Sequence, residues 1–135
     1  ALCKKYSPVE IGYDPRYATE LCQNLYNEEG LPMVEQPQFS SHLSESLKDI
    51  ACSISDDKFR HDGNMCASWQ VGNASAKEME GGLIKLVKPK GKDSTTLKVD
   101  FVAAFSMAHK RMLHNDEGQF NDYMRNQIKA GKGVL

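Results

Sequence analysis

The sequence is 135 residues long, which is the length of a single domain, and it is 40% hydrophobic and 26% charged. These proportions exclude a disordered or fibrous chain, and no apolar run approaches the ~18 residues of a membrane-spanning helix. The net charge of -1 gives no overall signature of nucleic-acid binding. The four cysteines form no Cys-x-x-Cys pair, which argues against a structural zinc site and favours reduced thiols in a cytosolic protein. They are Cys3, Cys22, Cys52 and Cys66.

The first part of the chain predicts a strand, a helix and a second strand in close succession. Apolar residues alternate with other residues over 9–13, which is a strand pattern. Asp14-Pro15 then predicts a helix start, because an acidic N-cap followed by proline is typical of helix N-termini, and Gly30 predicts its end. A short apolar run at 31–34 follows. This order with tight connections is typical of an α/β unit with parallel strands.

The middle of the chain predicts an amphipathic helix, a polar segment and a strand. The helix is expected over 43–54, where apolar residues form one stripe. Residues 56–75 are polar and predict an ordered loop or an edge element, with Trp69 as an expected core anchor. A strand is expected at 83–87, after two glycines.

The last part of the chain predicts two helices of different character. The helix expected over 95–113 is apolar almost all round between Val99 and Ala108, so we expect it to be the buried helix of the domain. Residues 115–135 are more polar and predict a weakly amphipathic helical tail. We therefore expect one α/β domain over residues 1–114, with a short mixed sheet flanked by helices.

Two aspartates, Asp14 and Asp100, occupy positions that allow both a structural and a chemical role. Each is predicted at the start of a helix, where an acidic side chain caps the free backbone N–H groups and interacts favourably with the helix dipole. Asp14 also follows a strand, and ligand sites of open α/β sheets gather at the carboxyl ends of strands. If both carboxylates meet there, their oxygens suit a hard divalent cation.

The segment around His61 and Asn64 holds a further group of polar residues. A histidine beside Asp, Gly and Asn is suited to be a ligand or a general base, and equally suited to a turn held by hydrogen bonds. Both interpretations stay open from the sequence alone.

A lysine-rich stretch surrounds the predicted connection between the last strand and the buried helix. A solvated loop explains such a stretch, and so does contact with a nucleic-acid backbone, which is local and does not appear in the net charge. The candidate lysines are Lys88, Lys90, Lys92 and Lys98.

The order of these motifs resembles the C-terminal nuclease domain of tailed-bacteriophage terminase large subunits. In that family a strand ends in Tyr-Asp-Pro, as at Tyr13-Asp14-Pro15, and a Lys-x-Asp motif opens an apolar helix, as at Lys98 and Asp100. A His-x-Gly-Asn segment followed by Trp and Asn is also similar. Its counterparts here are His61, Gly63, Asn64, Trp69 and Asn73. The residues before this tryptophan differ from the usual Pro-Val-Leu-x of the family.

The resemblance implies a partial ribonuclease H-like fold and a metal-dependent endonuclease. It implies that Asp14 and Asp100 hold Mg²⁺ or Mn²⁺ in a two-metal site and that the four lysines contact DNA. It places His61 and Asn64 beside the metal ligands or against DNA. The family has another catalytic aspartate on an upstream strand that this sequence does not include, so we expect a truncated domain that is inactive on its own.

The resemblance also implies a biological setting, which is the cutting of concatemeric double-stranded DNA during phage DNA packaging. The implied partners are double-stranded DNA, the terminase ATPase domain, the small terminase subunit and the portal. The implied location is the cytoplasm of the host cell, away from any membrane, for a chain encoded by a phage or prophage. Two alternatives stay open: a non-catalytic α/β remnant or interaction module, and another ribonuclease H-like metal nuclease.

Overall fold

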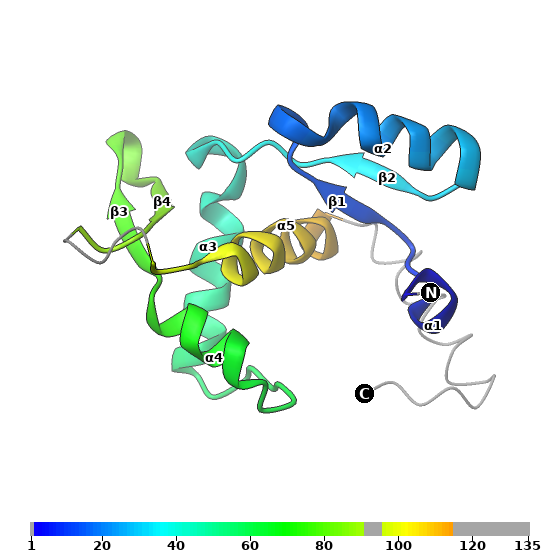
Figure 1. Cartoon of the computed structure of the whole chain (residues 1–135). Helices are drawn as coiled ribbons and strands as arrows, with labels where there is room; N and C mark the ends of the chain where they lie inside the picture. The colour runs from blue at the N-terminus through cyan, green and yellow to red at the C-terminus, as the bar shows by residue number, and fades with distance from the viewer. Residues whose placement is uncertain (1, 91–95, 115–135) are drawn as a thin grey trace.

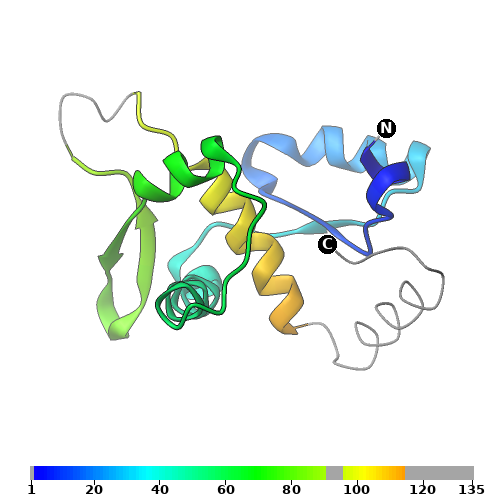
Figure 2. The same ribbon diagram turned by 90° about the horizontal axis from the view of Figure 1, so that it is seen from below.

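A computed structural model describes residues 2–90 and 96–114 of the chain (Figure 1). The long helices α3 and α5 lie between two small β units, one on each side (Figure 1, Figure 2). The elements are α1 (Leu2–Tyr6), β1 (Ile11–Tyr13), α2 (Pro15–Glu29), β2 (Met33–Glu35), α3 (Ser40–Ser55), α4 (Met65–Gly72), β3 (Ser75–Glu78), the short helix η1 (Glu80–Gly82), β4 (Ile84–Val87) and α5 (Asp100–His114). The expected helical tail at 115–135 and Lys92 lie outside the described residues.

The β1–α2–β2 unit has the predicted parallel arrangement. Ile11 pairs with Met33 and Tyr13 with Glu35. Asp14 is the N-cap of α2, with Pro15 as the first helical residue. Gly30 ends the helix in the left-handed conformation, at φ 63°, which glycine adopts without strain. The local signals of the sequence therefore set both ends of this helix.

The second β unit is an antiparallel hairpin of β3 and β4. Its register pairs Ser75 with Val87 and Lys77 with Lys85. Within the described residues β1 and β2 form one two-stranded sheet and β3 and β4 another. The mixed α/β class with short sheets flanked by helices is thus confirmed, although the parallel and antiparallel pairs are separate sheets.

Helices α3 and α5 pack closely in the centre of the fold. Leu43 and Ile50 of α3 and Met107 of α5 are buried. Ser46 is fully buried and its Oγ donates a hydrogen bond to the carbonyl of Ser106, at 2.8 Å. Small side chains at this crossing allow the two helices to approach closely, because a larger side chain would need space that the contact does not offer.

Three expectations about the second half of the chain were wrong. The polar segment 56–75 contains helix α4, which Asn64 caps by accepting a hydrogen bond from the Ala67 N–H at 3.1 Å. Trp69 is 48% exposed, because α4 lies at the periphery, so it is no core anchor. Helix α5 begins at Asp100 and buries only one face, which packs on α3 and β1. No helix in the described ranges is long and apolar enough to cross a membrane.

Candidate metal site

Asp14 lies where β1 ends and α2 begins, and its carboxylate is engaged by Arg16. Oδ1 accepts a hydrogen bond from the Arg16 backbone N–H at 3.1 Å, which is the helix cap. The Arg16 guanidinium donates to the same carboxylate, with Nη2 at 2.9 Å from Oδ2. These hydrogen bonds favour the charged form and hold the pKa of Asp14 below its ordinary value. Asp14 is therefore an ionised carboxylate, and its present partner is a side-chain cation.

Asp100 is exposed in the first turn of α5, and it takes part in none of the ion pairs of the described residues. Its backbone surroundings are fixed by two amide side chains of the α4 region. Gln70 Oε1 accepts a hydrogen bond from the Phe101 N–H at 2.7 Å. The buried Asn73 donates through Nδ2 to the Lys98 carbonyl at 3.1 Å. These two hydrogen bonds hold the backbone at the start of α5, and they therefore fix the position of the Asp100 backbone from which its side chain extends.

Contacts between β1 and α5 show that the two elements run antiparallel. Glu10, before β1, forms an ion pair with Arg111 near the end of α5, at 2.6 Å. Gly12 lies against Met107, one turn earlier in α5, where a Cβ on the glycine would be 3.8 Å from Met107 Cβ. Moving forward along β1 therefore means moving backward along α5, as Figure 1 shows.

In this arrangement the two candidate ligands lie beyond the contact of Gly12 with Met107, on the side away from the ion pair of Glu10 with Arg111. Asp14 follows Gly12 by two residues, and Asp100 precedes Met107 by seven residues, or about two helical turns on the same face. Their oxygens are donors that Mg²⁺ and Mn²⁺ prefer, so the donor chemistry fits a hard cation. The described residues contain no group of three His, Cys, Asp or Glu that could hold a metal ion. A complete two-metal set would thus need donors beyond these two.

His61 and Asn64 lie in the loop before α4 and have local structural roles. His61 Nδ1 accepts a hydrogen bond from the Gly63 N–H at 3.0 Å, and its ring stacks on Phe59 with centroids 6.1 Å apart. Asn64 caps α4. His61 lines an apolar pocket together with Phe101, the neighbour of Asp100. The structure therefore brings His61 to the start of α5, but into no group of three metal-binding side chains among the described residues.

The candidate lysines that the structure describes are on the surface. Lys88 and Lys90 follow β4 and Lys98 precedes α5, and all three are exposed. The sequence drew no attention to Lys77, which lies opposite Lys85 in the hairpin. It also drew none to Arg16, although an arginine two residues after an N-cap aspartate is a signal that could have suggested the pair. No comparable signal distinguished Gln70.

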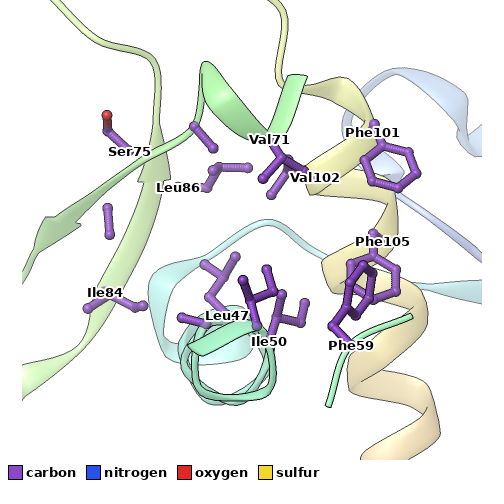
Figure 3. A pocket seen from close by; sticks show the side chains of 14 residues that line it. Leu47, Ile50, Phe59, Val71, Ser75, Ile84, Leu86, Phe101, Val102 and Phe105 are labelled. Atoms are coloured by element: carbon purple, nitrogen blue, oxygen red, sulfur yellow. The ribbon is translucent and has the colours of Figure 1, made fainter. Parts of the chain in front are cut away.

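Two pockets are lined in part by residues of the β3–β4 hairpin. The larger, of about 210 Å³, is lined almost entirely by apolar side chains of α3, α5 and the hairpin, including Ile50, Ile84 and Phe105 (Figure 3). The smaller, of about 80 Å³, is more polar, and both Arg16 and Lys85 line it. Arg16, at the start of α2, and Lys85, in β4, therefore border one pocket.

Comparisons with known proteins identify the family of the chain. The family model of the terminase large subunit, endonuclease domain, matches residues 2–116. Protein YmfN of Escherichia coli (strain K12) is 33% identical over 122 residues, which are 89% of this chain and 26% of that protein. The crystal structure of the HK97 bacteriophage large terminase matches with a TM-score of 0.66 at 18% identity, over 82% of this chain and 22% of that one. The chain thus spans about a quarter of the length of these relatives. It belongs to the family of terminase large-subunit endonuclease domains.

Proposed function

We propose that the chain serves as a metal-dependent endonuclease domain that cleaves double-stranded DNA, with Asp14 and Asp100 as ligands of Mg²⁺ or Mn²⁺. The observation that supports the proposal is the antiparallel course of β1 and α5, in which Asp14 follows the strand and Asp100 opens the helix. Family membership supports the reaction class. When bound, the cations would activate water and stabilise the leaving oxygen of a phosphodiester.

The residues of the chain have separate tasks in this proposal. Asp14, already ionised, presents its carboxylate at the end of a strand. Gln70 and Asn73 position the first turn of α5 and thereby Asp100. The exposed lysines Lys88, Lys90 and Lys98, together with Lys92, attract the DNA backbone without reading its sequence. His61 and Asn64 support the site from the loop before α4.

Two features indicate that a two-metal site would need further ligands besides Asp14 and Asp100. The described residues hold no group of three His, Cys, Asp or Glu that could bind a metal ion, whereas a two-metal site takes more oxygen ligands than two carboxylates supply. Among the described strands β1 pairs with β2 alone, so no described strand pairs with its other edge. A strand that pairs there with an acidic residue would complete the ligand set. The related proteins are about four times longer, which is consistent with such a source.

The wider role follows from the family. We infer that the domain acts in phage DNA packaging, in the cytoplasm of the host cell, as the product of a phage or prophage. Its partners would be double-stranded DNA, the terminase ATPase domain, the small terminase subunit and the portal.

The test is Mn²⁺ binding by the chain and two variants, Asp14→Asn and Asp100→Asn. Asparagine is a good N-cap, so Asp14→Asn keeps α2 capped while it removes the charge. Each variant should lose at least about tenfold in Mn²⁺ affinity with an unchanged circular dichroism spectrum, since a carboxylate ligand of a hard cation is removed.

Asp57→Asn is the matched control, because Asp57 is an exposed aspartate with φ 53°, which asparagine also adopts readily. It should bind Mn²⁺ as the unaltered chain does. Equal Mn²⁺ binding by all four proteins would overturn the assignment of the ligands. A folded chain that binds no Mn²⁺ and cuts no plasmid would favour the non-catalytic interaction module.

A further inference from the structure

The hairpin of β3 and β4 places two lysines directly opposite each other. Lys77 and Lys85 are partners in the antiparallel register, and both are exposed. Directly opposite residues of a hairpin have neighbouring side chains, and like charges at such a position destabilise the pair of strands. Neither lysine forms any of the ion pairs found among the described residues. The hairpin therefore carries a local concentration of positive charge at some cost to its stability.

The two faces of the hairpin differ in chemistry. Ala76 and Leu86 form the neighbouring pair in the register, and both line the apolar pocket against α3 and α5. Because side chains alternate between the faces of a strand, Lys77 and Lys85 lie on the opposite, outward face. Glu78, the acidic residue of β3, alternates with Lys77 and so lies on the inner side. The outward face is thus basic, and the inner one is mainly apolar.

The position of the hairpin in the fold leaves its basic outward face accessible to a large partner. The hairpin forms one side of the molecule, with α3 and α5 between it and the β1–β2 sheet (Figure 2). Lys85 and Arg16, the ion-pair partner of Asp14, line the same small pocket. Lys88, which is also exposed, follows β4 immediately.

We propose that the outward face of the β3–β4 hairpin, centred on Lys77 and Lys85, binds the phosphate backbone of double-stranded DNA and directs the duplex toward Asp14. The direction toward Asp14 rests on the proposed nuclease function, whereas the binding itself requires no metal. A polyanion relieves the repulsion between the two ammonium groups, which a neutral ligand cannot do. Contacts to the phosphate backbone carry no sequence information, so we expect this binding to be independent of DNA sequence.

The experiment measures the binding of a short DNA duplex by the full chain in EDTA at several salt concentrations. In the double variant Lys77→Ala/Lys85→Ala the slope of log affinity against log salt should decrease in magnitude by about 1.8, because each lost phosphate contact removes ~0.9. The matched control is Lys4→Ala/Lys5→Ala in α1, which removes the same charge from two exposed lysines and should leave the slope unchanged. Two duplexes of unrelated sequence should bind equally.

A second variant separates DNA binding from folding. Lys77→Glu places opposite charges at the cross-strand position, so the hairpin should be at least as stable as before, while the affinity for DNA should fall further than in a single Lys77→Ala variant. Equal salt slopes for the hairpin variant and the α1 control, or no salt-dependent binding by the unaltered chain, would overturn the proposal. Loss of DNA binding in the hairpin variants without any Mn²⁺ binding by the chain would support the hairpin surface and reject the metal site.

Discussion

The two ends of the candidate metal site are constructed in opposite ways. At the β1–α2 junction the side chain of Asp14 is engaged, because Arg16 occupies its carboxylate. At the start of α5 the backbone is engaged instead, through Gln70 and Asn73, and the Asp100 carboxylate is exposed without an ion pair in the described chain. One ligand is therefore limited by a competing cation, and the other depends on how well its backbone is positioned.

This difference separates the two properties that a metal site needs. A cation that binds Asp14 has to displace a guanidinium, which lowers the apparent affinity. A cation that binds Asp100 meets an exposed carboxylate, but its affinity depends on whether the first turn of α5 stays in place. Variants can therefore change the two ends independently, and the β1–α5 register changes both at once.

The largest effect on stability is expected at the ion pair of Glu10 with Arg111, which joins the start of β1 to the end of α5. Arg111→Met removes the partner of Glu10, whose side chain is only 24% exposed. Leaving this carboxylate partly buried without its hydrogen bonds should lower the free energy of unfolding by about 1–2 kcal/mol. Urea unfolding at pH 7 measures it. Arg60→Met breaks an ion pair whose two side chains are both mostly exposed, and should cost less than about 0.5 kcal/mol. Equal losses for the two variants would contradict this role of Glu10.

Acid should weaken the ion pairs at both ends of β1, which are those of Glu10 with Arg111 and of Asp14 with Arg16. Hydrogen bonds from Arg111 hold the pKa of Glu10 below its ordinary value, as those from Arg16 do for Asp14. A carboxyl group with a lowered pKa in the folded state stabilises the fold above its unfolded pKa, near 4, and this contribution is lost as pH falls through the folded pKa. Unfolding free energy should therefore decrease below about pH 4–5. Arg111→Met should show a shallower decrease over that range, and an identical pH profile would contradict the Glu10 contribution.

A smaller effect is expected from changing the Asp100 end alone. Gln70→Ala removes the acceptor of the Phe101 N–H, which should cost about 0.5–1 kcal/mol, as for a lost helix cap. Hydrogen exchange at the Phe101 amide should become faster, while the Arg16 amide, which donates to Asp14, should keep its rate. Gln23→Ala, on the exposed side of α2, is the control. Faster exchange at both amides would mean that the two ends are not independent.

The smallest effect concerns the competing cation at Asp14. Arg16→Gln should raise the Mn²⁺ affinity about two- to fivefold, since an ion pair as exposed as this one is worth about 0.2–1 kcal/mol. Arg16→Lys keeps the charge and should leave the affinity closer to that of the unaltered chain. Titration with Mn²⁺ measures both. A weaker affinity in Arg16→Gln would mean that Arg16 assists the metal site instead of competing with it.

The parts of the fold that could be predicted are those that depend on adjacent residues. Asp14-Pro15 and Gly30 set the ends of α2 because caps and left-handed glycines act within a few residues. The parallel pairing of β1 with β2 followed from the short strand–helix–strand connection. Family membership followed from the order of motifs, which needs no tertiary contact.

The parts that could not be predicted depend on contacts between distant residues. The β1–α5 register relies on Glu10 and Arg111, which are 101 residues apart. The lysine pair of the hairpin appears only when the register is known, since Lys77 and Lys85 belong to different strands. Trp69 was expected in the core because it is large and apolar, but its exposure depends on where α4 packs. The roles of Asp14 and Asp100 as metal ligands remain predictions.

The apolar pocket beneath the hairpin has a practical consequence for every stability measurement above. Its lining of aliphatic and aromatic side chains is open to solvent in the native state and large enough for a small aromatic molecule. Fluorescent dyes that brighten on apolar surfaces will therefore bind the folded chain, and a dye-based melting curve will begin from a high signal. The single tryptophan, half-exposed on α4, offers an intrinsic reporter that needs no added dye. Its emission should shift to longer wavelength as α4 leaves α5.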